Sequence, residues 1–192
     1  MLINSIVNSK FNSVTYVLSD SGHRGVWLVD CGDVEELNVS DVTGVLLTHI
    51  HYDHIYGINR LLERFPDAKI YTNDFGKEGL SNPRLNLSKY FPDGELFTIA
   101  KPESVYSLEG KPVLSILGCE ARILSVPGHD PSCLAFLIDG KLFTGDALIP
   151  GEKVIASFPR SNRAEAKASE QQLLELGKHH IILPGHAIKN DD

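Results

Sequence analysis

The chain of 192 residues is poor in sulfur-containing residues, with three cysteines and one methionine. So few cysteines, and an odd number of them, do not fit the disulfide framework of a small secreted protein. Long apolar runs are also missing, because no window approaches the roughly 20 apolar residues of a membrane-spanning helix. Residues 1–10 lack the apolar stretch of a signal peptide. These absences predict a cytoplasmic protein that does not contact a membrane.

Basic charge is scarce as well. The sequence has 18 Lys and Arg against 25 Asp and Glu, a formal net charge of −7. This balance argues against a broad surface for nucleic acid and favours a small-molecule substrate. Hydrophobic residues make up 42% and charged residues 22%, which is ordinary for a globular protein. The length predicts a single domain over residues 1–192, and the oligomeric state is left open.

Apolar periodicity predicts two similar halves, each with several strands followed by a helix. In the first half, strands are expected at 3–7, 14–18, 26–29, 45–47 and 69–72, with a helix at 54–65. In the second half, strands are expected at 96–99, 113–117, 122–126, 134–138, 142–144 and 180–183, with a helix at 163–176. Two such halves indicate two sheets packed face to face with helices outside.

Several local signals refine this pattern. Asp139-Gly140 is a strong two-residue hairpin turn. Asn162 and Glu165 match a capping box at the start of the last helix, and Gly177 is expected to cap its end. Residues 73–95 show no clear period, and a loop of that length often forms the rim of a site.

Three of the eight histidines fall within six residues, together with a carboxylate. His49 and His51 are two apart, so at the end of a strand they can point the same way. Asp53 and His54 follow at the expected start of a helix, where an anionic side chain is favoured. Imidazole and carboxylate groups suit Zn²⁺ and other borderline divalent ions. The segment therefore predicts a metal site.

Three later strand ends supply further residues of the same kind. His129 follows the strand expected at 122–126, Asp146 follows 142–144, and His186 follows the last strand. A single histidine after Pro-Gly is usually only a turn residue. Four strand-to-loop junctions that each deliver His or Asp instead predict one shared rim.

In this order, these residues resemble those of the metallo-β-lactamase-fold metallo-hydrolase superfamily. The resemblance implies an α+β fold, a four-layer αββα sandwich, with two metal ions in a cleft at the sheet edges. It implies that one ion is held by His49, His51 and His129, the other by Asp53, His54 and His186, and that Asp146 bridges them. Asp30 matches the first acidic motif of the superfamily, which supports the site without being a ligand.

The resemblance also implies the chemistry. Two divalent ions, zinc by expectation and iron or manganese as alternatives, share a water and lower its pKa. The bridging hydroxide is the nucleophile, and a substrate oxygen on a metal is polarised. The catalytic residues are then Asp53, which orients the nucleophile, and Asp146, which holds both ions.

Within the superfamily, the sequence is most similar to short glyoxalase-II-like hydrolases, which cleave thioesters of glutathione. Glyoxalase II proper has a C-terminal helical domain that supplies basic residues to glutathione, whereas this sequence ends six residues after His186. We therefore expect hydrolysis of a thioester or ester without a strong preference for glutathione. Lys153, Arg160 and Arg163 are candidates for contact with an anionic substrate.

Two other functions remain open. Persulfide dioxygenases share the His-x-His-x-Asp-His element but use one iron ion, bound by two histidines and an aspartate. A non-catalytic metal-binding module is the second. A nuclease of the tRNA-processing type needs a basic surface, which the net charge of −7 does not favour.

Overall fold

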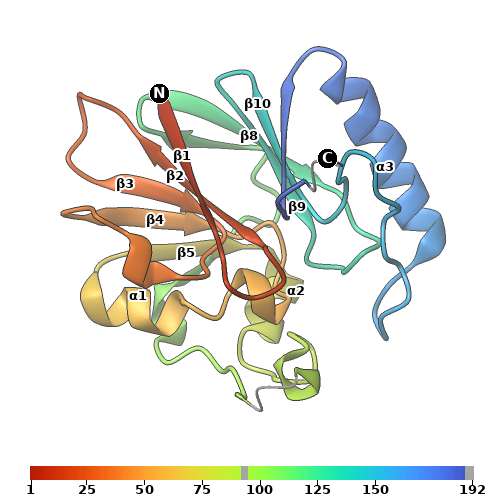
Figure 1. Cartoon of the computed structure of the whole chain (residues 1–192), viewed down its shortest axis with the longest axis horizontal. Coiled ribbons are helices and arrows are strands. Elements are labelled where there is room, and N and C mark those ends of the chain that lie inside the picture. Colours follow the sequence, from red (N-terminus) through yellow and green to blue (C-terminus); the bar gives the residue numbers. More distant parts are fainter. Residues whose placement is uncertain (92–94, 189–192) are drawn as a thin grey trace.

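The computed structural model describes residues 1–91 and 95–188, and they form two β-sheets packed face to face with helices on the outside (Figure 1). The first sheet has the order β1-β2-β3-β4-β5-β6 and the second the order β11-β10-β9-β8-β7. The strands of the first sheet are β1 (Leu2–Val7), β2 (Val14–Ser19), β3 (Val26–Val29), β4 (Val42–Leu46), β5 (Lys69–Thr72) and β6 (Val105–Ser107). Those of the second are β7 (Val113–Ile116), β8 (Cys119–Ser125), β9 (Leu134–Ile138), β10 (Lys141–Gly145) and β11 (Ile181–Pro184). The α-helices are α1 (Ile58–Arg64), α2 (Asp74–Gly79) and α3 (Arg163–Gly177).

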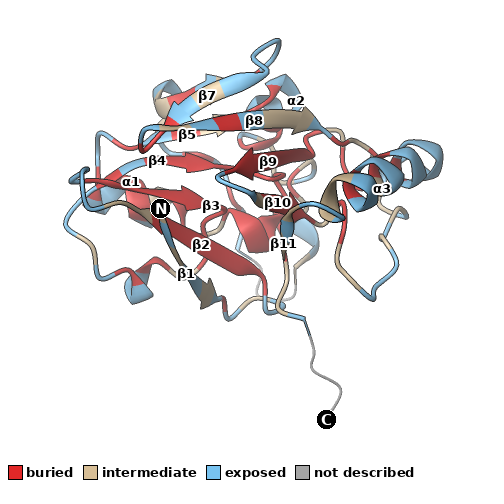
Figure 2. Cartoon of the chain, turned by 90° about the horizontal axis from the view of Figure 1, so that it is seen from above, coloured by how far each residue is buried: buried red, intermediate tan, exposed pale blue. Residues whose placement is uncertain are grey.

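The central strands β2, β3 and β9 are buried on both faces, and alternate residues enter different cores (Figure 2). In β9, Phe136 and Ile138 pack between the two sheets, whereas Leu137 packs with Leu173 of α3 on the outer side. A third core lies on the other side of the first sheet, where Leu61 of α1 joins residues of β2, β3 and β4. Three apolar layers between four structural layers confirm the predicted αββα sandwich.

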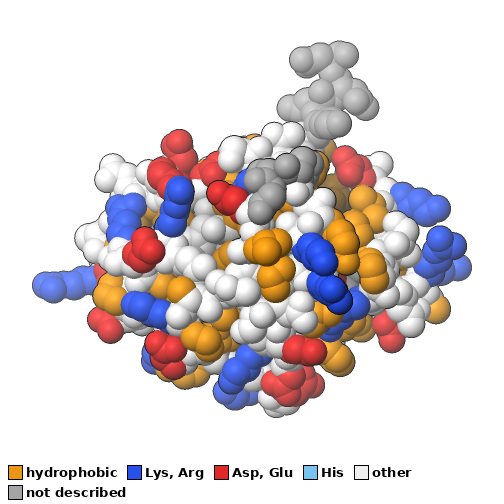
Figure 3. All heavy atoms as spheres, turned by 90° about the horizontal axis from the view of Figure 1, so that it is seen from below, with side chains coloured by type: hydrophobic (Ala, Val, Ile, Leu, Met, Phe, Trp, Pro, Cys, Tyr) orange, Lys and Arg blue, Asp and Glu red, His pale blue; other side chains and the backbone are white. Residues whose placement is uncertain are grey.

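The predicted domain, residues 1–192, includes residues 92–94 and 189–192, which lie outside the described residues; its extent stays a prediction. Within residues 1–91 and 95–188, no helix is long and apolar enough to cross a membrane. Figure 3 shows one face of the molecule, on which basic and acidic side chains are interspersed.

The predicted turn and helix start are confirmed, whereas the predicted helix end is wrong. Asp139 and Gly140 both have positive φ, 48° and 77°, in the tight turn between β9 and β10. The side chain of Asn162 accepts hydrogen bonds from the first turn of α3. Gly177 does not cap this helix but lies inside it, and Lys178 follows as the cap residue.

Two predictions for segments around the first sheet are wrong: the strand at 96–99 and the unbroken helix at 54–65. Residues 96–99 form no strand, because their backbone groups bond to side chains instead, as Phe97 N does to Ser88 Oγ and Thr98 O to Asn59. The sheet edge is taken by β6, which the sequence did not indicate. The helix expected at 54–65 is split into a 3₁₀ turn ending at His54 and the shorter α1.

The split in this helix has a steric cause. Gly57 lies between the two pieces, and a Cβ there would come within 1.9 Å of the carbonyl oxygen of Gly32. The backbone N–H of Gly57 donates to Cys31 O, and Cys31 N donates to His54 O. The loop after β3 is thus bound to the histidine-rich segment, which must bend to meet it.

Candidate metal centre

The histidine-rich segment lies in the loop that leaves β4 and ends in a short 3₁₀ turn. The side chains of His49, His51 and His54 in this loop are buried. Asp30, directly after β3, holds the loop in place by accepting hydrogen bonds from Thr48 N at 2.8 Å and Thr48 Oγ1 at 2.7 Å. The start of the loop is therefore fixed to the neighbouring strand.

Asp30 also orients one of the imidazoles. Its Oδ2 lies 2.9 Å from His54 Nδ1, so a proton on Nδ1 leaves the Nε2 lone pair facing the other site residues. Asp30 has a φ of 58°, in the left-handed region that aspartate tolerates better than most residues. Asp30 thus orients His54 without being a candidate ligand itself, as the family resemblance implies.

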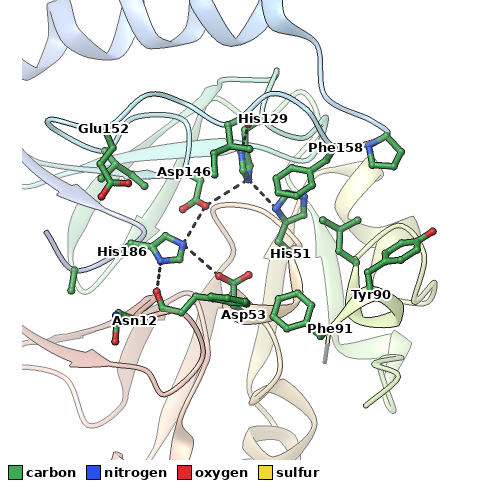
Figure 4. A pocket seen from close by; sticks show the side chains of 16 residues that line it. Asn12, His51, Asp53, Tyr90, Phe91, His129, Asp146, Glu152, Phe158 and His186 are labelled. Carbon is green, nitrogen blue, oxygen red and sulfur yellow. Dashed lines mark hydrogen bonds and ion pairs between the residues drawn. The ribbon is translucent and has the colours of Figure 1, made fainter. Parts of the chain in front are cut away.

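His129 and His186 enter from the second sheet and are oriented by backbone carbonyls. His129 Nδ1 lies 2.7 Å from Ile155 O, and His186 Nδ1 lies 2.9 Å from Phe11 O. Each ring therefore turns its Nε2 towards Asp146, which follows β10 (Figure 4).

Helix α3 holds the loop that carries His129. Asn162 N donates to Gly128 O at 2.8 Å, and Ser161 Oγ donates to His129 O at 2.6 Å. Gly128 has a φ of 129°, and a Cβ there would come within 2.0 Å of Ala166 N. The close approach of this loop to the helix therefore requires glycine.

The seven predicted ligands come together in groups of three, and within a group the ligand atoms all lie within 4.8 Å of one another. One group consists of His49, His51 and His129, and another of Asp53, His54 and His186. A third group, His49, His54 and Asp146, overlaps with both. All seven residues predicted from the sequence are thus gathered in one place.

The spacing within these groups suits metal binding. His51 Nδ1 lies 2.9 Å from His129 Nε2, and Asp53 Oδ2 lies 3.4 Å from His186 Nε2 and 3.5 Å from His54 Nε2. Ligand atoms about 2.0–2.1 Å from a tetrahedral ion are separated from each other by about 3.3–3.4 Å. Each group could therefore surround one ion after small adjustments.

Asp146 lies between the two groups. Its Oδ2 is 3.3 Å from His186 Nε2, 3.6 Å from His129 Nε2 and 3.9 Å from His49 Nε2. Its Oδ1 is 3.4 Å from His54 Nε2. One carboxylate thus reaches imidazoles of both groups, which is the geometry that a bridging ligand needs.

Two of the converging atoms lack a hydrogen-bond partner among the described residues. These atoms are His49 Nε2 and Asp146 Oδ1, and both are buried. A buried polar atom without a partner costs about 1–3 kcal/mol, so such atoms are rare in folded proteins unless a ligand satisfies them. The donor set of the site, five imidazoles and two carboxylates, fits divalent metal ions.

Burial and the nearby carboxylates act on the imidazoles of the site in opposite directions. Burial lowers the pKa of His49 and of His51 well below the usual value, so both imidazoles are neutral at neutral pH, the form that binds metal. Burial alone would also lower the pKa of His54, but the carboxylates of Asp53 and Asp146 raise it to about 10. Burial would raise the pKa of Asp146, but the surrounding imidazoles, His54 first, hold it well below its usual range.

Sequence reasoning did not single out Asp130, which is buried beside the first group. Its Oδ2 lies 3.9 Å from His51 Nε2, while His51 Nδ1 faces His129. Asp130 is itself held by Ser132, whose N and Oγ donate to Oδ1 at 2.8 and 2.6 Å. The signal available in the sequence was that Asp130 directly follows the candidate ligand His129.

A cavity of about 790 Å³ opens onto the metal-site residues His51, Asp53, His129, Asp146 and His186. Most of its wall is apolar, and the larger side chains there are Phe11, Tyr90, Phe91, Ile149, Ile155 and Phe158. Tyr90 and Phe91 come from residues 73–95, the segment predicted to form a site rim.

The basic side chains proposed for an anionic substrate do not line this cavity. Lys153 lines a small adjoining cavity of about 30 Å³, whose wall also includes His129 and Asp146. Neither Arg160 nor Arg163 lines either cavity. The guanidinium of Arg160 instead lies 5.6 Å from the ring centre of Phe75.

Comparison with known proteins identifies relatives of the chain. The family model described as "Metallo-beta-lactamase superfamily" matches residues 11–186. A protein of Streptococcus pyogenes serotype M6 named "Probable metallo-hydrolase" is 29% identical over 198 residues, covering 97% of this chain and 84% of that protein. The hydroxyacylglutathione hydrolase of Shewanella oneidensis is 32% identical over 161 residues, covering 79% of this chain. The match spans only 54% of the length of the Shewanella protein.

Solved structures share the fold. The BLEG-1 B3 metallo-beta-lactamase has a TM-score of 0.86 and 24% identity, covering 97% of this chain and 92% of that chain. The protein TTHA1623, solved in a di-iron-bound form, has a TM-score of 0.75 and 22% identity, covering 96% of this chain and 92% of that one. At these identities the likeness establishes the fold alone.

Proposed function

Because the chain belongs to the metallo-beta-lactamase superfamily, we propose that it is a two-metal hydrolase of esters or thioesters, similar to glyoxalase II. The observation that carries this proposal is the gathering of seven His and Asp side chains in two groups, with Asp146 between them. Distant homology to hydroxyacylglutathione hydrolases supports the choice of bond.

In this proposal each ion has its own set of residues. His49, His51 and His129 hold the first ion, Asp53, His54 and His186 hold the second, and Asp146 bridges them. Zinc is the metal we propose, and iron or manganese also suits these ligands. The di-iron form of the structurally similar TTHA1623 supports keeping iron among the metals to be tested.

Bound divalent ions of this kind lower the pKa of a water from 15.7 to roughly 7 and polarise a substrate carbonyl. The protein supplies the geometry. Asp53 lies at the cavity wall, where its carboxylate can accept a hydrogen bond from the attacking water and orient it. Asp30, Ile155 O and Phe11 O fix the orientations of His54, His129 and His186. Because these partners are in place, little reorganisation is needed when substrate binds.

Metal analysis combined with a substrate panel tests the proposal. Protein stripped of metal is reloaded with zinc, iron or manganese, assayed for bound ions and offered thioesters, esters, lactones and phosphodiesters. We expect close to two ions per chain and hydrolysis of an ester or thioester. A plateau at one ion would favour the mononuclear dioxygenase alternative. Two bound ions without hydrolysis of any substrate would favour a non-catalytic metal-binding module.

A further inference from the structure

The large cavity is continuous with the candidate metal centre. His129 of the first ligand group, Asp53 and His186 of the second, and Asp146 between them all belong to its wall. A substituent held in this cavity would therefore be attached directly to the bond that the ions act on. Its volume, about 790 Å³, is in the range of sites that enclose small molecules.

Side chains from three separate segments make the wall apolar. Phe11 is 65% exposed, Tyr90 62% and Ile155 56%, although each is a large hydrophobic residue. They lie respectively in the loop between β1 and β2, in a 3₁₀ turn after α2, and in the loop between β10 and α3. Exposed apolar side chains that converge on one cavity typically mark a binding site, because a ligand removes them from water.

Aromatic contacts hold parts of this wall in position. The rings of Phe11 and Phe91 meet edge to face with their centres 5.2 Å apart. Phe158 packs against the imidazoles of His51 and His129, with ring centres 4.9 and 5.4 Å away. The apolar surface thus reaches the first ligand group and is largely preformed.

Away from the candidate metal ligands, the wall of the cavity carries little charge. Apart from the candidate ligands Asp53 and Asp146, Glu152 is the charged residue on the wall, and no Lys or Arg among the described residues lines it. The proposed ions would offset the charges of Asp53 and Asp146. A carboxylate at the far end of a substituent, away from the ions, would instead meet apolar side chains and Glu152 without a described Lys or Arg on the wall to pair with, which is unfavourable.

We propose that this cavity binds an apolar substituent of an uncharged ester or thioester, such as a medium-length alkyl chain, and excludes substituents that end in a carboxylate. The proposal rests on the proposed function and specifies its substrate class. In an apolar pocket, a single missing methylene group typically costs about 10-fold or more in kcat/KM. A substrate that lacks several methylene groups should therefore have a kcat/KM at least about 10-fold lower, even if the cavity remains partly open.

Four S-methyl or S-hexyl thioesters test the proposed preference. Their hydrolysis by zinc-loaded protein is followed by release of the thiol. S-methyl hexanethioate and S-hexyl thioacetate place alkyl chains of similar length, pentyl and hexyl, on opposite sides of the bond. At least one should exceed S-methyl thioacetate about 10-fold or more in kcat/KM. S-methyl monothioglutarate, which ends in a carboxylate, should fall about 10-fold or more below S-methyl hexanethioate. Equal values across the series, or a preference for the glutarate, would overturn the proposal.

A pair of matched variants places the effect in the cavity. Ile155→Lys puts a cation on the wall, while the backbone carbonyl that accepts from His129 is retained. Leu174→Lys makes the same change of charge at a half-exposed apolar position on α3, outside the cavity. Ile155→Lys should shift the kcat/KM ratio about 10-fold towards the glutarate thioester, and Leu174→Lys should leave it unchanged. A ratio unaffected by Ile155→Lys would contradict the proposal.

Binding without catalysis separates this proposal from the proposed function. Hexyl methyl sulfide has the alkyl chain but no bond to hydrolyse, and its binding to metal-free protein can be followed by ligand-observed NMR. We expect binding that Ile155→Lys weakens and Leu174→Lys does not. Binding of the sulfide without hydrolysis of any ester or thioester would refute the proposed function alone. Hydrolysis with a kcat/KM that does not depend on chain length, together with no binding of the sulfide, would refute the cavity proposal alone.

Discussion

Replacing Asp146 should damage the site more than removing any single histidine. The two oxygens of Asp146 lie within 3.3–3.9 Å of four imidazole nitrogens that belong to both ligand groups. In Asp146→Ala, both proposed ions lose a ligand, whereas His186→Ala affects one. Even a lost supporting contact behind a ligand typically costs about 10–100-fold in metal affinity, so a lost shared ligand should cost at least this at each ion.

We expect a turnover at least about 100-fold lower for Asp146→Ala, or roughly 2.7 kcal/mol of barrier. The assay is thioester hydrolysis at saturating zinc, together with chelator competition that resolves the two binding steps. Thermal unfolding of the metal-free variant checks that it folds. His186→Ala should weaken one binding step and leave the other near its original affinity. Near-normal turnover of Asp146→Ala, or loss of one binding step alone, would refute the bridging role.

Three further variants and one further substrate test other parts of the proposed site. Asp30→Ala leaves Thr48 N and Oγ1 without an acceptor, so it should destabilise the protein by at least about 2 kcal/mol in urea unfolding, and wild-type stability would show that these bonds contribute little. Asp130→Ala should lower the affinity of the first ion about 10–100-fold and spare the second, and equal effects on both would contradict its position beside His51. Gly57→Ala should destabilise by about 1–3 kcal/mol because its Cβ would clash with the backbone, and a neutral effect would mean that the loop yields easily. S-lactoylglutathione should be turned over with a kcat/KM no more than about 10-fold above a small generic thioester, roughly 1.4 kcal/mol, and a thousandfold preference would show that glutathione is recognised.

The gathering of the candidate ligands could be predicted from the sequence because these residues follow regular strands. A strand is recognisable from its apolar residues, and the residue after it has a nearly fixed place at the sheet edge. Asp146 after β10 and His186 after β11 are examples. Asp130 was missed because its role depends on which ring nitrogen of His51 faces the site, and no sequence pattern reports this.

The parts that were predicted wrongly depend on contacts between distant segments. Residues 96–99 have the composition of a strand, but Ser88 and Asn59 bind their backbone before a sheet edge can. The split before α1 arises from the approach of Gly57 to Gly32. The apolar cavity could not be foreseen either, because Phe11, Tyr90 and Ile155 are far apart in the sequence and meet only in the folded chain.

The central claim is that two ions lie in the two ligand groups on either side of Asp146. A crystal structure of the zinc-loaded protein, with anomalous data collected at the zinc edge, tests it most directly. If both ions are bound, two anomalous peaks are expected about 3.5–4 Å apart, each within bonding distance of one oxygen of Asp146. A single peak, or two peaks that Asp146 does not bridge, would contradict it.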